Sequence, residues 1–216
     1  TITLTEFNAL TTASVALTAG DTITLSAADG DDLSGLTLTN VDGVSAANGV
    51  DVVLSIAQHT TPGVSGAGTY SITDTLSNVL TEASGGSSIL NGASQINVTF
   101  GSGTEVATLT SLGDASAPTA IDFGDDAATI TTAELDSLNT ASVALTGGDT
   151  VTVVASNSND FTSKTTTNVD SITVATGVAI TVNAAQSSLV NTSGGGTYAV
   201  TDTLSNVLTE ASGGSA

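Results

Sequence analysis

Short segments in which apolar and polar residues alternate recur along the chain. Alternation with a period of two is typical of half-buried β-strands. Clusters of Gly, Asn, Asp and Ser separate the segments and supply residues that favour turns. We therefore predict short strands within residues 14–18, 22–25, 36–39, 50–56, 96–100, 106–109 and 120–123.

A second pattern joins a strand to a short polar stretch that ends in leucine, as in ITLTEFNAL at 2–10 and ITTAELDSL at 130–138. We expect each polar stretch to form a helical turn at a corner, where its last leucine closes the core. In the TDTLSN motif, Asp74 and Asp202 are placed to cap such a turn. The expected corner leucines are Leu10, Leu80, Leu138 and Leu208.

The chain contains a tandem repeat with an offset of 128 residues. Residues 68–87 (GTYSITDTLSNVLTEASGGS) match residues 196–215 at 18 of 20 positions, and 48 of 88 positions agree between 1–88 and 129–216. We interpret residues 1–128 as the first repeat unit and residues 129–216 as a partial second unit, in one continuous stack without a linker. We expect the repeat to continue beyond Ala216.

The spacing of the strands favours an all-β fold. Five strand-to-strand steps make up one repeat of 128 residues, or about 25 residues per step. Coils of this size are typical of a β-solenoid, a stack like a parallel β-helix whose turns are about 4.8 Å apart. We expect this fold, with short helical corners. The alternative is a string of β-sandwich domains, one per repeat, which the low aromatic content of 3% disfavours.

The charge of the chain excludes two classes of partner. The chain has 21 acidic residues and one basic residue, Lys164, and its net charge is -20. Nucleic acids and anionic lipid surfaces both require clustered Lys and Arg, so we expect neither as a partner. The apolar runs are too short to cross a bilayer, so we expect no membrane insertion.

The sequence offers little for catalysis. His59 is the only histidine, and the matching position in the second copy is Ser187. The chain has no cysteine to act as a nucleophile, and its glycines do not form a phosphate-binding motif. We therefore predict that the protein is not an enzyme.

Two acidic clusters are candidate calcium sites, because Ca²⁺ is bound by turns rich in oxygen ligands. In the second copy, the first cluster is replaced by Asn157, Ser158, Asn159 and Asp160, and most of its charge is lost. Solvated acidic turns are therefore the alternative interpretation. The candidate ligands are Asp29, Asp31 and Asp32 in DGDD, and Asp122, Asp125 and Asp126 in DFGDD.

The recurring segments YSITDTLSNVL (70–80) and YAVTDTLSNVL (198–208), together with INVTF (96–100), resemble repeats of very large secreted proteins of marine and other Gram-negative bacteria. Those proteins carry DTxxN-like repeats and include adhesins, surface-layer-like proteins and filament-forming proteins. The resemblance implies an extracellular or cell-surface location, export without a cleaved signal, and folding that often depends on calcium.

These observations predict a non-enzymatic extracellular structural repeat that associates with itself into a fibre, a sheath or a surface-layer array. The alternative is a rod-like, calcium-stabilised stalk of a large bacterial adhesin, whose ligand would be bound elsewhere.

Overall fold

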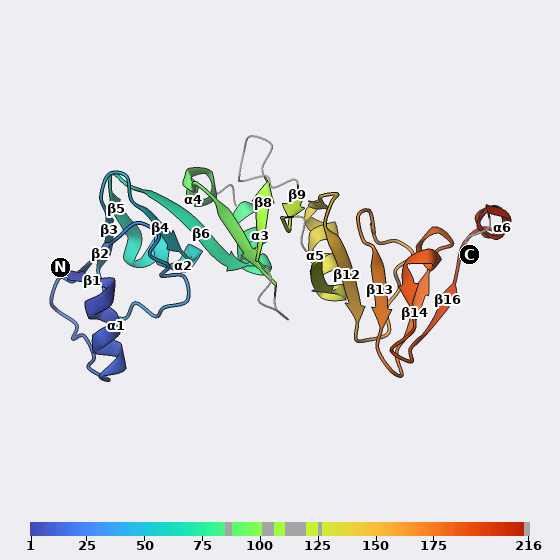
Figure 1. Ribbon diagram of the computed structural model, residues 1–216, viewed down its shortest axis with the longest axis horizontal. Coiled ribbons are helices and arrows are strands. Elements are labelled where there is room, and N and C mark those ends of the chain that lie inside the picture. Colours follow the sequence, from blue (N-terminus) through green and yellow to red (C-terminus); the bar gives the residue numbers. More distant parts are fainter. Residues whose placement is uncertain (85–87, 101–105, 111–119, 125–126, 214–216) are drawn as a thin grey trace. The chain divides into compact units, whose positions relative to one another are not determined.

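The computed structural model describes residues 1–84, 88–100, 106–110, 120–124 and 127–213. The chain divides into two compact units. The first comprises Thr1–Thr99 with Thr108–Pro118, and the second comprises Phe100–Ala107 with Thr119–Ala216. Each unit is built from short strands and short helices (Figure 1).

The first unit begins with a strand that leads directly into a helix. Its helices are α1 (Leu4–Thr12), α2 (Ile56–Gln58), the π-helical η1 (His59–Gly63), α3 (Leu76–Ser84) and α4 (Ser88–Gly92). Its strands are β1 (Ile2–Thr3), β2 (Thr24–Ala27), β3 (Gly43–Ala46), β4 (Asp51–Leu54), β5 (Val64–Gly66), β6 (Thr69–Thr75) and β7 (Ile96–Thr99). β8 (Val106–Thr110) contains residues of both units.

The second unit repeats much of this order. Its strands are β9 (Ala120–Asp122), β10 (Ala127–Thr131), β11 (Ala144–Leu145), β12 (Thr150–Ala155), β13 (Ser171–Val174), β14 (Ala179–Val182), β15 (Val190–Asn191) and β16 (Thr197–Val200). Its helices are α5 (Thr132–Ala141), the 3-10 helix η2 (Ala185–Leu189) and α6 (Leu204–Gly213). A shift of 128 residues places β3 and β4 on β13 and β14, residue for residue.

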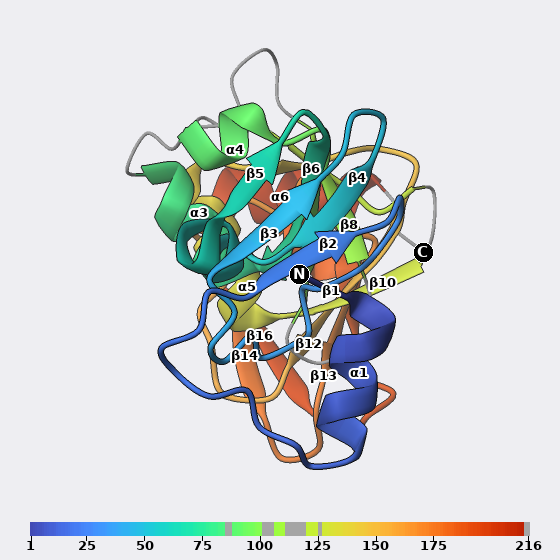
Figure 2. The same cartoon turned by 90° about the vertical axis from the view of Figure 1, so that its left-hand side faces the viewer.

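Parallel pairing joins the strands within each unit. In the first unit the strands lie in the order β1-β2-β3-β5 (Figure 2), and β6 lies between β4 and β7. In the second unit the orders are β10-β12-β13-β15 and β14-β16. Paired residues are close in sequence: Asp51 faces Thr69, 18 positions later, and Ile72 faces Ile96, 24 positions later. In these pairs a strand therefore faces a segment that follows it at a short distance along the chain.

The predicted all-β fold class is wrong. Helices account for 29% and strands for 32% of a mixed α/β structure with several small parallel sheets, and the described residues form no closed solenoid or barrel. The alternative of β-sandwich domains fails as well, because these consist of antiparallel sheets and the pairings within the units are parallel.

Helix signals that the strand pattern obscured explain the error. Thr3 and Thr131 each begin a T-x-x-E capping box, in which the hydroxyl accepts the N–H of Glu6 or Glu134 and the glutamate accepts the N–H of the threonine. In α3 the buried side chains of Leu76, Val79 and Ala83 have the spacing of one helix face. These stretches are therefore helices of nine or ten residues, and not single turns at corners.

The aspartates of the TDTLSN motif lie one position before the capping residue. The Thr75 hydroxyl accepts the N–H of Asn78 (3.3 Å), while Asp74 accepts the Asn78 side-chain amide (2.7 Å) and the N–H of Ile56 (3.0 Å). Asp74 therefore ties the start of α3 to the start of α2. Asp202 makes the same set of contacts with Asn206 and Ala184.

A buried glutamine ties the connecting loops together in both copies. The Gln58 side chain donates to the carbonyls of Leu33 (2.5 Å) and Leu36 (2.8 Å), and its oxygen accepts the N–H of Ser55 (2.9 Å). Both groups of the buried side-chain amide are thus paired with backbone groups. Gln186 repeats the arrangement with the carbonyls of Phe161 and Lys164 and the N–H of Asn183.

We expect Gln186→Ala to lower the free energy of unfolding by about 2 kcal/mol, because a buried side chain loses its hydrogen bonds to the Phe161 and Lys164 carbonyls and to the Asn183 N–H. Urea denaturation followed by circular dichroism measures this change. The matched control is Ser188→Ala, which removes an exposed hydroxyl from the same helix. Equal stability of the two variants would contradict a stabilising role for Gln186.

Candidate functional site: a recurring apolar pocket

The TNVD sequence shared by both copies holds one wall of a pocket in place. Asn168 adopts a left-handed backbone conformation (φ 62°), and its side chain donates to the carbonyl of Leu145 (2.6 Å). Asp170 accepts the N–H of Val151 (2.8 Å). In the first copy, the equivalent bonds join Asn40 to Leu17 (2.6 Å) and Asp42 to Ile23 (2.7 Å).

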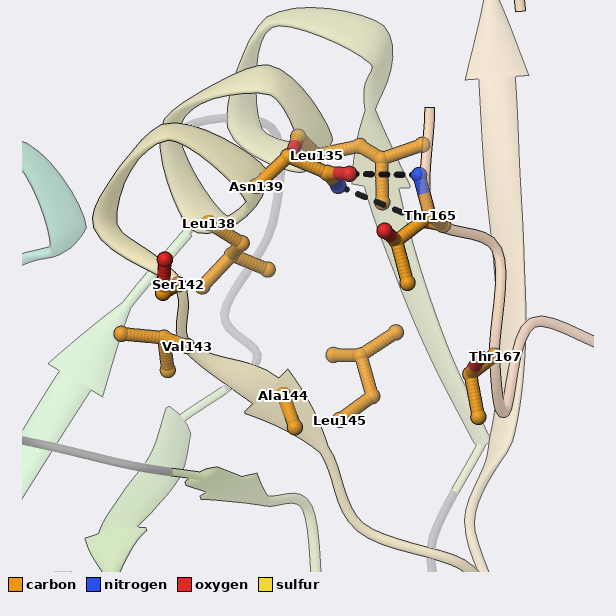
Figure 3. Close-up of a pocket in the computed structure, with 9 residues that line it drawn as sticks. All are labelled: Leu135, Leu138, Asn139, Ser142, Val143, Ala144, Leu145, Thr165 and Thr167. Carbon is orange, nitrogen blue, oxygen red and sulfur yellow. Dashed lines mark hydrogen bonds between the residues drawn. The ribbon is translucent and has the colours of Figure 1, made fainter. Parts of the chain in front are cut away.

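The pocket of the second unit lies between α5, β11 and residues 165–167 (Figure 3). Its volume is about 250 Å³. Asn139 closes one end, since its side-chain oxygen accepts the N–H of Thr165 (2.5 Å) and its amide donates to the Thr165 carbonyl (3.2 Å). The lining residues are Leu135, Leu138, Asn139, Ser142, Val143, Ala144, Leu145, Thr165 and Thr167.

The first unit has the same pocket, with a volume of about 340 Å³. Nine of its ten lining residues are those of the second pocket shifted by 128 positions. Leucine at 135 is replaced by phenylalanine at 7, and asparagine at 139 by threonine at 11. The lining residues are Phe7, Leu10, Thr11, Ser14, Val15, Ala16, Leu17, Thr37, Thr39 and Asn40.

The chemistry of these pockets is neutral. Both are lined by aliphatic or aromatic side chains together with hydroxyl and amide groups, and the aliphatic side chains are buried more deeply in the second pocket than in the first. Among the residues that line them, no side chain is ionisable. Pockets of this size and lining hold small apolar groups through shape and the hydrophobic effect. They provide no acid, base or nucleophile beyond neutral hydroxyls.

A polar cluster lies on the surface of the first unit around Asp51. Its carboxylate accepts hydrogen bonds from the hydroxyls of Thr69 (2.6 Å), Ser71 (2.7 Å) and Ser94 (2.8 Å). Burial raises the pKa of the Asp51 carboxyl, but these three hydrogen bonds lower the pKa by more, so the net pKa lies below the usual value. The second copy has Ala179 in place of Asp51, so the cluster is not repeated.

The first predicted calcium cluster is bonded to its own protein backbone. Asp29 accepts the N–H of Asp51 (2.9 Å), and Asp31 accepts the N–H of Ala28 (2.8 Å). Asp32 accepts both the N–H (2.9 Å) and the hydroxyl (2.7 Å) of Ser34. The three carboxylates thus each stabilise a different part of the loop.

The second predicted cluster is only partly described. Asp122 accepts the N–H of Gly124 (2.8 Å). Asp125 and Asp126 lie outside the residues that the structure describes. In the described part of the chain, no three His, Cys, Asp or Glu side chains gather in a way that could hold a metal ion. Calcium binding at either cluster stays a prediction.

His59 lies against the ring of Tyr70, with 4.4 Å between the ring centroids. Burial lowers the pKa of His59 below its usual value, while the nearby charge of Glu82 raises it in part. The contact with Tyr70 gives His59 a packing role at the end of α2. The prediction that the protein is not an enzyme stays a prediction.

The pockets were missed by sequence reasoning, although a signal for them was present. Residues 13–18 and 141–146 both read ASVALT, and the TNVD motif is identical in the two copies. The left-handed residues Ser14 and Ser142 (φ 55° and 57°) lie within these identical blocks. These blocks form part of the pocket walls. Their identical sequences in the two copies therefore indicated that both copies share the same local geometry there.

Comparisons with known proteins identify no relative: no family model, curated protein or solved structure matches the chain. None of the helices in the described ranges has the length and apolar character needed to cross a bilayer. The function must therefore be argued from the residues and their arrangement.

We expect Asp51→Asn to destabilise the protein at neutral pH by on the order of 1 kcal/mol, a modest effect for a partly exposed carboxylate. Because folding lowers the pKa of Asp51, its contribution is complete above the unfolded-state pKa. The contribution is lost as the pH falls through the lower folded-state pKa. The difference in unfolding free energy between wild type and Asp51→Asn should therefore shrink in acid.

Urea denaturation at a series of pH values between about 2 and 7, which brackets ordinary carboxyl pKa values, measures this difference. Asp21→Asn is the control, because Asp21 is exposed and its change removes the same charge. A difference that is as large in acid as at neutral pH would contradict the assignment.

Proposed function

We propose that this chain is a structural repeat segment without catalytic activity, and that it associates into an extracellular fibre, sheath or surface-layer array. One observation carries the proposal: the residues that are identical in the two copies maintain the framework. Asn40, Asp42 and Gln58, and their counterparts 128 positions later, form the same bonds to backbone groups in each copy.

Core positions support the proposal, because they change only among apolar residues. Leu33 is replaced by Phe161 and Val44 by Ile172, and all four side chains are fully buried. Such exchanges preserve packing at the same places. The repeat therefore preserves the same core packing in both copies.

Several ionisable side chains outside this framework differ between the two copies. His59 is replaced by Ser187. Asp51 is replaced by Ala179, and the single lysine, Lys164, stands where the first copy has Leu36. Lys164 pairs with Asp136 of α5. A repeated active site would need the same reactive side chains in each copy, whereas a scaffold tolerates such changes on its surface.

The extracellular assignment follows from composition and resemblance. A chain with one basic residue, no cysteine and a surface rich in hydroxyl and amide groups is typical of the large exported repeat proteins that the Tyr70–Leu80 and Tyr198–Leu208 segments resemble. Association of the repeats with one another is supported by apolar side chains that the second unit leaves exposed on β16 and α6.

Immuno-electron microscopy of the native material, with antibody raised against this chain, tests the proposal. We expect the label to follow an ordered fibre, sheath or lattice outside the cell. Isolated flexible rods that project from the cell surface would favour the adhesin stalk instead. Label confined to the cell interior would overturn both.

The same microscopy on samples treated with a calcium chelator tests whether calcium stabilises the assembly. Loss of order only after chelation would assign the stabilisation to calcium, while unchanged order would show that the assembly does not depend on calcium.

A further inference from the structure

The second unit exposes a row of large apolar side chains on β16 and α6. Leu204 is 74% exposed and Leu208 is 58% exposed. The others in this row are Val200 (44%), Tyr198 (43%) and Val207 (38%). We call these five residues the β16–α6 edge. An exposed apolar row beside a strand indicates a surface that another segment covers.

In the first copy, the same positions are covered. Ile72, Leu76 and Val79 correspond to Val200, Leu204 and Val207, and their exposed fractions are 0%, 3% and 0%. Tyr70 and Leu80, which correspond to Tyr198 and Leu208, are half-buried. Since residues 196–215 nearly repeat residues 68–87, the difference in exposure comes from what packs against them.

The cover in the first copy includes the segment Ser88–Phe100, which contains α4 and β7. β7 pairs in parallel with β6, and Ile72 faces Ile96. The N–H of Ile72 donates to the carbonyl of Gln95 (2.9 Å), and the N–H of Ser94 donates to the carbonyl of Tyr70 (2.8 Å).

The helix of the segment contributes as well. The Tyr70 hydroxyl donates to the carbonyl of Ile89 (2.7 Å) in α4. Gly92 lies so close to that hydroxyl that an added Cβ would be 2.4 Å from it. The buried Leu90, Ile96, Val98 and Phe100 of the same segment supply its apolar face.

The β16–α6 edge already has the geometry of its covered counterpart. The Asp202 carboxylate accepts the Asn206 amide at 2.7 Å, as Asp74 accepts that of Asn78. β16 pairs with β14 in the same register in which β6 pairs with β4. Among the described residues, β16 has a paired strand on that side only. The β16–α6 edge therefore has this geometry in the chain alone, without a bound partner.

We propose that the β16–α6 edge binds a further copy of the Ser88–Phe100 segment of this repeat, as a parallel strand with its Ile96 opposite Val200. Backbone bonds to the free side of β16 provide the register, and the apolar row provides the affinity. The proposal deepens the proposed function and rests on it, because the partner is repeat sequence.

The two copies differ at the positions that contact Ser94. In the first copy, Ser94 donates to Asp51 and lies 2.9 Å from the Ser71 hydroxyl. The second copy has Ala179 and Ala199 at the positions of those two partners, and both are exposed. Binding at the β16–α6 edge therefore lacks this polar contact, and restoring it should strengthen binding.

The test uses the whole 216-residue chain and a fluorescent synthetic peptide of residues 88–100. We expect saturable binding by fluorescence anisotropy. Val200→Asp and Leu204→Asp should each weaken binding about tenfold or more, since each places an unpaired charge against an apolar segment. Leu204 is largely exposed in the chain alone, so its replacement leaves the fold intact, which circular dichroism verifies.

Ala9→Asp is the control, because Ala9 is an exposed apolar residue on a helix of the first unit and lines neither pocket. It should leave the peptide affinity unchanged. The double variant Ala179→Asp, Ala199→Ser should tighten binding several-fold. That gain should disappear with a peptide in which Ser94 is replaced by alanine.

Three results would overturn the proposal. They are no saturable binding, equal loss of affinity in Ala9→Asp and Val200→Asp, and self-association of the chain through this edge that excess peptide does not displace. In the last case, sedimentation velocity would identify a second copy's edge as the occupant. An ordered native polymer together with absent peptide binding would leave the proposed function standing and refute this docking alone.

Discussion

Parallel strand pairing is the constraint on which the rest of this structure depends. Two parallel strands cannot be joined by a tight hairpin, so the chain must cross back over before it adds the next strand. Here the crossings are short, with paired residues such as Asp51 and Thr69 only 18 positions apart. Each crossing carries backbone groups that lie outside the ladders, and these groups need partners of their own.

A small set of side chains supplies those partners. Gln58 donates to two loop carbonyls and accepts one backbone N–H. In the preceding crossing, Asn40 donates to the carbonyl of Leu17 and Asp42 accepts the N–H of Ile23. The short aliphatic side chains of the strands could exchange for one another without changing this arrangement. The polar anchors could not, because each depends on a particular donor and acceptor geometry. This explains why they are identical in a repeat whose surface charges differ.

Strand positions and the repeat were readable from the sequence, since alternation in INVTF and VDVVL marks β7 and β4 directly. The strands expected at residues 14–18 and 36–39 were wrong, because residues 14–18 form a turn and an irregular stretch, and residues 36–40 form a loop and turn held by Asn40. β3 was missed because GVSA has only weak strand character. The identical ASVALT and TNVD blocks indicate a shared local geometry, but they do not reveal how a helix, a loop and a strand approach one another to form the pockets.

The exposed edge follows from the same constraint. A strand in a parallel ladder offers its N–H and C=O groups on both sides, so every strand without a second neighbour is a place where pairing can continue. β6 and β16 have nearly the same sequence, and each pairs in the same register with an inner strand, β4 or β14, at the equivalent position of the repeat. β6 is covered by β7 on its outer side, and its apolar side chains are buried. The free side of β16 is therefore the position at which, as we propose, a further copy of the repeat continues the pairing that β7 provides for β6.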